Sequence, residues 1–275
     1  MTQLQNKVLR QPIPVRKRLP VYAFLMGSVI SYIGDMLTLL AIPWFVLQTT
    51  RSVTQTGITA FFSALPLVLS AFLSSALVDR LGYKRTSVIG DIFSCISVAL
   101  IPLLYYTINL AFWQLLLLVF LGGLLKSPGV TARTAMAPEL AQLAGMRLEL
   151  MNALSDGVIR ISRFLAAPLA GLLIVVIGTS NLLWFDALSF ALSALLIGLL
   201  VPAISLNAQA DEDIPIGYFA ALRAGLHFIW HDSLIFSLLL VSVVTNLLDA
   251  AWSSVIAPVY FQQIFHSPVL LGISI

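Results

Sequence analysis

The sequence predicts an all-α integral membrane protein whose apolar segments are transmembrane helices. Of the 275 residues, 59% are hydrophobic and only 10% are charged, whereas about 25% of the residues in a soluble domain are charged. Because a soluble fold must cover its surface with polar groups, this composition excludes a soluble enzyme and a disordered chain. The apolar stretches also run on for about 20 residues. Barrel strands alternate in polarity over roughly 10 residues, so these spans are predicted to be helical.

Seven apolar stretches are predicted to cross a membrane. In chain order they cover residues 21–47, 57–77, 87–108, 110–125, 164–177, 182–201 and 233–257. We expect the fourth to continue as a helix past Gly129 and the fifth to begin near Asn152. The final stretch, 268–275, is much shorter than the ~20 residues that a span needs. It is predicted to be the start of an eighth helix.

The first span follows a polar and basic tail, residues 1–20. Its apolar run exceeds the roughly 7–15 residues of a signal-peptide core, and no cleavage site of small residues follows it. We therefore expect it to remain in the mature protein as a transmembrane helix.

Basic residues between the spans predict the orientation. Of the 15 Lys and Arg residues, 14 fall in the tail, in the even-numbered loops or beside them, and only Arg51 falls on the other side. Cytoplasmic loops carry an excess of Lys and Arg. The chain is therefore predicted to be a multi-pass protein of the plasma (inner) membrane with a cytoplasmic N-terminus. Because the positive charges flank spans, the net charge of +3 does not indicate a nucleic-acid partner.

The longest predicted loop, residues 202–232, lies between the sixth and seventh spans. It contains an acidic run at 211–213, and residues 217–230 then have the spacing of an amphipathic helix lying on the inner surface. The acidic run lacks other ligand types nearby and is predicted to be a solvated linker. The single cysteine, Cys95, excludes an internal disulfide and a cysteine-rich metal site. We expect no metal and no cofactor.

The most informative motif lies between the second and third spans, at residues 75–85, SALVDRLGYKR. It resembles the signature loop of the major facilitator superfamily, G-x-L-x-D-R-x-G-R-K/R-x. The matching positions are Asp79, Arg80, Gly82 and Lys84, and Arg85 adds a cation. Gly82 allows a tight turn because glycine accepts a positive φ, and a carboxylate such as Asp79 can pair with arginines. Alternatively, the cations only anchor the helix ends on the inner side.

Other segments are similar to the exporter branch of this superfamily, which includes macrolide-efflux and enterobactin-export proteins. These segments cover residues 31–49, 131–140, 152–163 and 185–190. The resemblance implies the major facilitator fold. Residues 21–201 would form an N-terminal bundle of six helices in two three-helix repeats, and residues 233–275 would begin an incomplete C-terminal bundle. We expect either that about five further spans complete the protein or that the chain is a truncated, transport-inactive product.

The resemblance also implies an activity and the residues that carry it. It implies proton-driven export of a small amphipathic compound, drug-like or siderophore-like, by alternating access between two bundles. The expected partners are a small-molecule substrate, protons and the lipid bilayer, and the full-length protein is expected to be monomeric. In the family, the signature loop closes an inner gate, and Arg133 matches the position of a gating or proton-relay arginine.

Charged residues inside the spans are functional candidates, because burying one costs at least ~2.5 kcal/mol in a membrane. Asp35 lies near the middle of the first span, and Asp249 lies in the seventh. Either carboxylate could exchange a proton or attract a cationic substrate. The alternative for Asp35 is a structural carboxylate that pairs with another helix or is capped by Thr38. Asp186 is expected to be a structural group near the outer end of the sixth span.

Further charges suggest ion pairs within the bundle. Asp91, in the third span, is expected to support the cluster around Asp79. Arg160 and Arg163 are three positions apart and share one face of the fifth span. They either extend to the inner surface or pair with an aspartate of the bundle, for which Asp35, Asp91 and Asp156 are the candidates.

The sequence does not favour an enzyme. It contains no phosphate-binding Gly-x-x-x-x-Gly-Lys-Ser/Thr loop and no Gly-x-Ser-x-Gly nucleophile elbow. His227 and Asp232 have the His-x-x-x-x-Asp spacing of membrane acyltransferases, which leaves a membrane-bound acyl-transfer enzyme as an alternative. Asp232 equally has the position of an N-cap for the seventh span.

Overall fold

The computed structural model describes residues 15–203, 227–230, 232–265 and 267–274. The basic tail up to residue 14, the acidic run at 211–213 and most of the amphipathic helix predicted at 217–230 lie outside the described residues. The side chains of residues 15–17, 71–73, 75, 76, 79 and 274 lie outside them as well.

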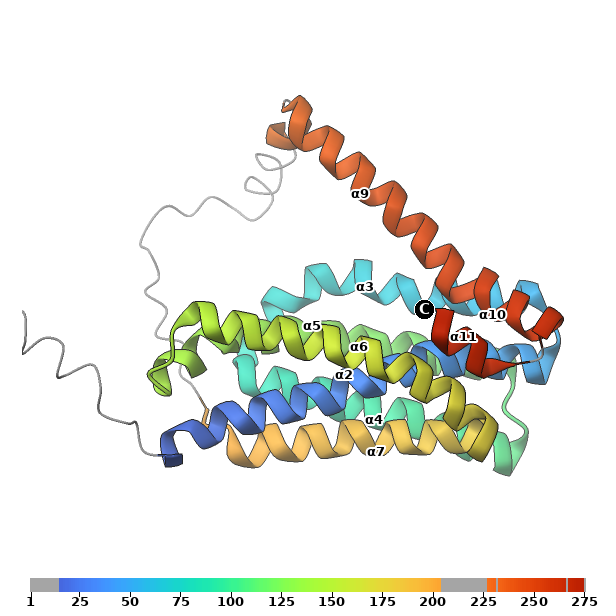
Figure 1. Cartoon of the computed structure of the whole chain (residues 1–275), viewed down its shortest axis with the longest axis horizontal. Helices are drawn as coiled ribbons and strands as arrows, with labels where there is room; N and C mark the ends of the chain where they lie inside the picture. Colours follow the sequence, from blue (N-terminus) through green and yellow to red (C-terminus); the bar gives the residue numbers. More distant parts are fainter. Residues whose placement is uncertain (1–14, 204–226, 231, 266, 275) are drawn as a thin grey trace, which may run out of the picture.

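The predicted all-α membrane fold is confirmed for the part of the chain that the structure describes (Figure 1). Seven helical stretches there are long and apolar enough to cross a membrane. The helices are α2 (Val15–Thr50), α3 (Val53–Leu81), α4 (Tyr83–Ile108), α5 (Phe112–Leu143), α6 (Leu148–Ile177), α7 (Thr179–Leu200), α9 (Ser233–Ala251), α10 (Ala257–Tyr260) and α11 (Pro268–Ser274). Two π-helical segments, η1 (Trp252–Ile256) and η2 (Phe261–Phe265), flank α10.

Helices α5 and α6 are longer than the predicted spans. Helix α5 has 32 residues, which is about 48 Å at 1.5 Å per residue, against a hydrocarbon core of about 30 Å. The length of an apolar stretch indicates only the part of a helix that lies in lipid. The helix itself can continue through polar residues, because their side chains find partners inside the bundle. Of the basic residues predicted around a loop here, Lys126, Arg133, Arg160 and Arg163 lie within helices, and Arg147 lies in the short link.

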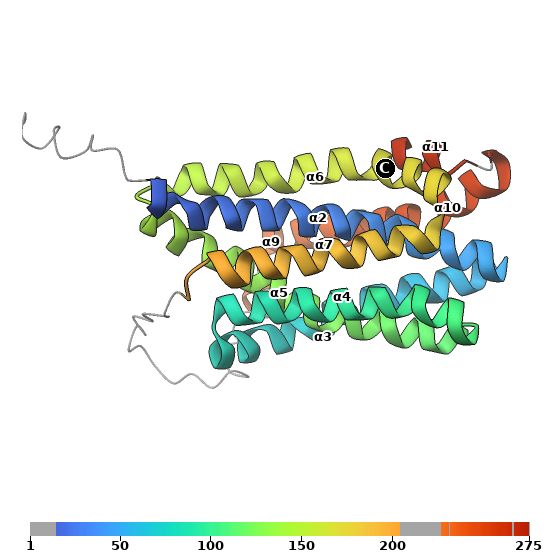
Figure 2. The ribbon, with the colours of Figure 1, turned by 90° about the horizontal axis from the view of Figure 1, so that it is seen from below.

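Helices α2 to α7 run antiparallel to their chain neighbours and pack into one bundle (Figures 1 and 2). Helix α2 packs against α6 and α7, helix α4 packs against α5 and α7, and helix α3 packs against α5. We call one end of the bundle the basic end. It contains the α3–α4 turn at Gly82, the α5–α6 link and the C-terminus of α7. The opposite end contains Arg51, between α2 and α3.

Single glycines make two of the helix connections. Gly82 alone joins α3 to α4, with φ +77° and ψ 163°, so it has the positive φ expected from the sequence. Gly178 alone joins α6 to α7 in nearly the same conformation, with φ +82° and ψ 158°. Residues with a Cβ rarely adopt this region. Each glycine therefore allows two long helices to reverse direction within one residue.

The bundle has two hydrophobic clusters. One lies toward the opposite end and includes Leu40, Ile101 and Phe190. The other lies toward the basic end and includes Met136 and Met151. A polar layer of charged and hydroxyl side chains lies between them, and this layer contains the candidate site.

The C-terminal helices differ from the rest. Helix α9 diverges from the bundle (Figure 1), and none of its residues is buried. The chain then returns through η1, α10 and η2, and α11 packs against α6. Gly272 of α11 lies directly on the α6 backbone, and Gly171 of α6 lies directly on α11, so a Cβ on either glycine would overlap the other helix.

Helices α4 and α5 approach closely where two glycines face each other. A Cβ on Gly90 would lie 3.0 Å from the carbonyl oxygen of Leu125 and 3.1 Å from Cα of Gly129. The contacting atoms are backbone atoms and cannot rotate away, so a large side chain there would push the helices apart.

We predict that Gly90→Leu lowers the free energy of unfolding by about 1–3 kcal/mol, the usual cost of overpacking. Thermal unfolding in detergent, followed by circular dichroism, measures the loss. The matched control is Gly57→Leu in α3, because a Cβ at Gly57 meets no atom within 4 Å among the described residues. Equal melting temperatures for the two variants would contradict the close approach of α4 and α5.

Candidate functional site

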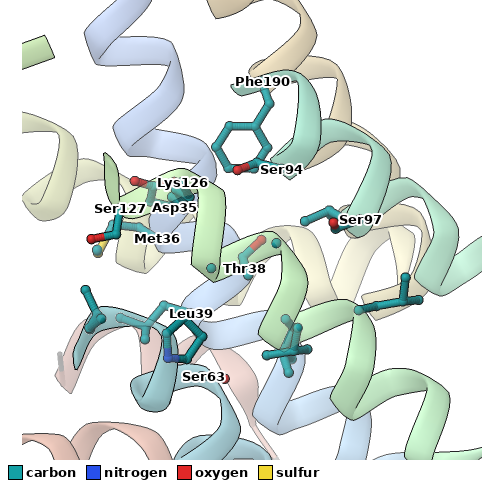
Figure 3. A pocket seen from close by; sticks show the side chains of 18 of the residues that line it. Asp35, Met36, Thr38, Leu39, Ser63, Ser94, Ser97, Lys126, Ser127 and Phe190 are labelled. Atoms are coloured by element: carbon teal, nitrogen blue, oxygen red, sulfur yellow. The ribbon is translucent and has the colours of Figure 1, made fainter. Parts of the chain in front are cut away.

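A cavity of about 430 Å³ lies in the bundle, between α2, α3, α4 and α5 (Figure 3). It extends from the middle of the helices toward the opposite end. Phe190 of α7, Arg163 of α6 and Ser254 of η1 complete its wall. The apolar lining includes Met36, Leu39, Ile42, Leu67, Val98, Ile101, Leu118 and Val119. Hydroxyl groups line it as well, from Thr38, Thr59, Ser63, Ser94, Ser97 and Ser127.

Asp35 and Lys126 form an ion pair in the wall of this cavity (Figure 3). Their side chains are only 16% and 27% exposed, respectively. The Lys126 Nζ also lies 4.8 Å from the centroid of the Phe190 ring, within the range of a cation–π contact. The ammonium group therefore lies between a carboxylate of α2 and an aromatic ring of α7, and it offsets the charge of Asp35.

Asp186 lies beside this pair and is fully buried. It accepts a hydrogen bond from the Thr38 hydroxyl, so Thr38 bonds to α7 and does not cap Asp35. Gly34 permits this contact, because a Cβ there would overlap the side chains of Asp186 and Ser189. The burial of Asp186 corrects the expectation of a group near the outer end of the span. Asp35 is a functional candidate because burying a charge in a membrane costs free energy, and the same reasoning applies to Asp186.

Asp91 and Arg133 form a second buried ion pair, with 2.5 Å between Arg133 Nη2 and Asp91 Oδ2. The Ser193 hydroxyl donates to Asp91 Oδ2 at 2.6 Å, and the Ser31 hydroxyl donates to Asp91 Oδ1 at 3.2 Å. Arg133 Nε donates to the Ser87 hydroxyl at 3.2 Å. Such hydrogen bonds are what a buried ion pair needs to offset its desolvation. The network joins α2, α4, α5 and α7.

The signature-loop residues lie at the basic end, apart from this network. Gly82 forms the turn, Arg80 and Arg85 are exposed, and Lys84 is half-buried. The backbone of Asp79 lies in the last turn of α3, and its side chain is outside the described residues. Arg133, which was expected to act with this loop, is 2% exposed and is paired with Asp91.

Three ion pairs occur among the described residues, and Arg160 and Arg163 are in none of them. Both arginines are exposed on α6, and Arg163 lies at the cavity wall. The aspartates expected as their partners, Asp35 and Asp91, are paired with cations of α5 instead. Asp249 is exposed on α9 and does not line the cavity. In the same described part of the chain, no group of three or more His, Cys, Asp and Glu residues could hold a metal ion.

Lys126 is the residue that sequence reasoning missed. Lys126 was counted among the basic residues of a cytoplasmic loop, because the apolar stretch before it ends at Leu125. A signal was nevertheless present, because the expectation that this helix continues past Gly129 already places Lys126 inside a helix. A lysine with helix on both sides of it cannot be a loop cation, so it is a candidate for an ion pair within the bundle.

We predict that Arg133→Gln lowers the free energy of unfolding by about 3–5 kcal/mol, because it leaves the Asp91 carboxylate buried without its cation. The matched control is Arg147→Gln. Arg147 pairs with Glu149 at 3.4 Å, but these side chains are 84% and 76% exposed, and such a pair contributes less than about 1 kcal/mol. Thermal unfolding of both variants in detergent measures the difference. Similar losses in the two variants would contradict a structural role for the buried pair.

Comparison with known proteins identifies the family. Residues 24–275 match the family described as Major Facilitator Superfamily. The chain is 32% identical over 264 residues to the multidrug efflux pump Tap of Mycolicibacterium fortuitum, covering 93% of this chain and 63% of that protein. It is 29% identical over 259 residues to the multidrug efflux pumps Tap of Mycobacterium bovis and Mycobacterium tuberculosis, covering 92% of this chain and 61% of each relative.

The chain thus spans less than two thirds of the length of these relatives. No solved structure matches it. The match to the family extends over nearly all of the chain and includes the helices that form both the cavity and the buried network. The chain therefore belongs to the major facilitator superfamily.

Proposed function

We propose that the protein exports small amphipathic compounds in exchange for protons, by alternating access. One observation carries this proposal: a buried ion pair, Asp35–Lys126, lies in the wall of a largely apolar cavity inside the membrane. The similarity to proteins named multidrug efflux pumps supports export as the direction.

The cavity suits a small amphipathic substrate. Its volume of about 430 Å³ lies within the range of roughly 300–1,000 Å³ that is usual for small-molecule sites. Aliphatic side chains and Met36 form much of the lining, and hydroxyl groups are scattered among them. Apolar contacts are tolerant of shape, and hydroxyl groups both donate and accept hydrogen bonds. Such a lining favours a chemically broad range of compounds over a single one.

The ion pair supplies a site for proton coupling. Asp35 pairs with Lys126 in the structure, and protonation of Asp35 would remove the attraction between them. A proton on Asp35 would therefore free Lys126 and loosen α2 from α5, whereas deprotonation would restore the pair. Because the two residues lie on different helices of the bundle, proton binding and helix arrangement would be linked.

The orientation and the gate belong to the same proposal. Of the described Lys and Arg residues outside the helix interiors, most lie at the basic end, and Arg51 lies at the opposite end. We place the basic end in the cytoplasm, following the bias of cytoplasmic loops toward Lys and Arg. Gly82 and the charged residues around it, Asp79, Arg80, Lys84 and Arg85, would then form the inner gate. Arg133 would support this gate indirectly, by holding α4 against α5.

The acyl-transfer alternative has less support. Asp232 Oδ1 accepts hydrogen bonds from the backbone N–H groups of Leu234 at 3.0 Å and Ile235 at 3.1 Å. This is the arrangement of a helix N-cap, so the position of Asp232 is explained by the start of α9. Membership of a transporter family also argues against an enzyme.

We predict that Asp35→Asn lowers efflux driven by a pH gradient at least about tenfold, which corresponds to a rise of ~1.4 kcal/mol in the barrier. Asparagine keeps the size of the side chain but cannot exchange a proton. The measurement is efflux of ethidium from cells that express the protein, with and without a proton uncoupler.

The matched control is Asp249→Asn, which removes a carboxylate that is exposed on α9 and lies outside the cavity. This variant should retain efflux if Asp35 is the coupling group. Full, uncoupler-sensitive efflux in Asp35→Asn would refute the coupling role of Asp35. Loss of efflux in Asp249→Asn alone would move that role to α9.

A further inference from the structure

We propose that Lys126 occupies a cation site built for the substrate, so that the preferred substrates are amphipathic compounds with a single positive charge. The idea rests on the proposed function, because it names the class of compound that the cavity takes. In this view the lysine is a tethered competitor, and an organic cation must displace its ammonium group to bind.

The surroundings of Lys126 Nζ are those of a bound organic cation. A carboxylate oxygen of Asp35 lies on one side of the ammonium group, and the face of the Phe190 ring lies on another. The distance from Nζ to the ring centroid is 4.8 Å. A carboxylate together with an aromatic face is a common means of recognising ammonium ligands. Asp35, Lys126 and Phe190 all line the cavity, so a free ligand in the cavity can reach the same two groups.

Charge in the cluster favours a cation as well. Asp186 lies one turn before Phe190 on α7, and it accepts a hydrogen bond from Thr38, which lies one turn after Asp35 on α2. Two carboxyl groups therefore lie beside a single ammonium group. At Asp35, the positive charge of a ligand would take the place of the ammonium group, whereas an anionic ligand would lie against the carboxylate. The other charged residue of the cavity wall, Arg163, lies on α6.

Lysine is well suited to be displaced. Its ammonium is a compact charge on a flexible four-carbon stem, so it can leave Asp35 without a movement of α5. The Lys126 side chain is also the more exposed of the pair, at 27% against 16% for Asp35. The apolar lining, which includes Leu39, Val98 and Ile101, is available for the hydrophobic body of the ligand.

The experiment measures binding of ethidium to the purified chain in detergent by its fluorescence. Ethidium carries a permanent positive charge, and the neutral dye Nile red is the matched probe without charge. We expect Lys126→Met to bind ethidium at least about tenfold more tightly than the native chain, since it leaves a carboxylate and a ring with no competing ammonium. Nile red affinity should stay within about twofold.

Two further variants test the geometry. Lys126→Arg keeps a cation at the site and should show no gain in ethidium affinity. Arg51→Asn removes a positive charge outside the cavity and should also leave the affinity unchanged; asparagine tolerates the φ of +53° at that position. A similar gain in Arg51→Asn would show that net charge, and not the site, controls binding, and it would overturn the proposal.

Lys126→Met leaves Asp35 buried without a cation, and this variant can fail to fold. Phe190→Leu in the native background then decides the question. It should weaken ethidium binding at least about threefold, because the broad planar cation loses more contact with the ring than the compact lysine ammonium loses, and it should leave Nile red binding nearly unchanged. If Phe190→Leu weakens both dyes equally, or if a folded Lys126→Met gains nothing for ethidium, the cation site does not exist.

Measurements of binding and of transport together distinguish failure of the cation site from failure of the export proposal on which it rests. If Lys126→Met binds ethidium more tightly but the protein shows no proton-driven efflux, the cation site stands and the export proposal fails. If efflux depends on Asp35 but Lys126→Met shows the same change for ethidium and Nile red, export stands and the cation site fails.

Discussion

The structure depends on two cations of helix α5, each of which holds an aspartate of a neighbouring helix inside the membrane. Lys126 pairs with Asp35 of α2, and Arg133 pairs with Asp91 of α4. The two cations are seven positions apart and so lie on one face of α5, two turns from each other. Removing a charge from water costs several kcal/mol unless a partner and further hydrogen bonds offset it. Correct assembly of α2, α4 and α5 is therefore required before any of the four charges can be buried.

The two pairs differ in a way that suits different roles. The Arg133–Asp91 pair has additional hydrogen bonds: Ser31 and Ser193 donate to Asp91, and Ser87 accepts from Arg133. Its geometry is therefore fixed from four helices. The Lys126–Asp35 pair lies in a cavity wall, where the lysine has a ring contact and room on the cavity side. One face of a single helix thus carries a pair fixed by further hydrogen bonds and, near the middle of the bundle, the cavity-wall pair that we propose to be exchangeable.

The sequence alone predicts the class of fold and the order of the helices, because these follow from apolar length. The cost of a charge in lipid also marks Asp35 as a functional candidate. It also predicts the turn at Gly82, because only glycine suits a reversal that short. It does not predict which charges meet. Lys126 was placed with the inner-side cations because hydropathy records where a helix leaves an apolar stretch and not where the helix ends. The pairing of Arg133 with Asp91 depends on how α4 packs against α5, and that packing depends on contacts such as Gly90 with Gly129.

The single-residue connections at Gly82 and Gly178 constrain how the protein can move. Neighbouring Cα atoms are only 3.8 Å apart, so a one-residue link keeps the end of α3 beside the start of α4, and the end of α6 beside the start of α7. Neither helix of such a couple can slide lengthwise past the other; it can only swing about the shared corner. Each of these two helix pairs can therefore move only by rotation about its glycine, and the two glycines lie at opposite ends of the bundle. A tilt of α3 or α4 about Gly82 must therefore displace the residues of that helix that face the cavity, and the displacement grows with their distance from the turn.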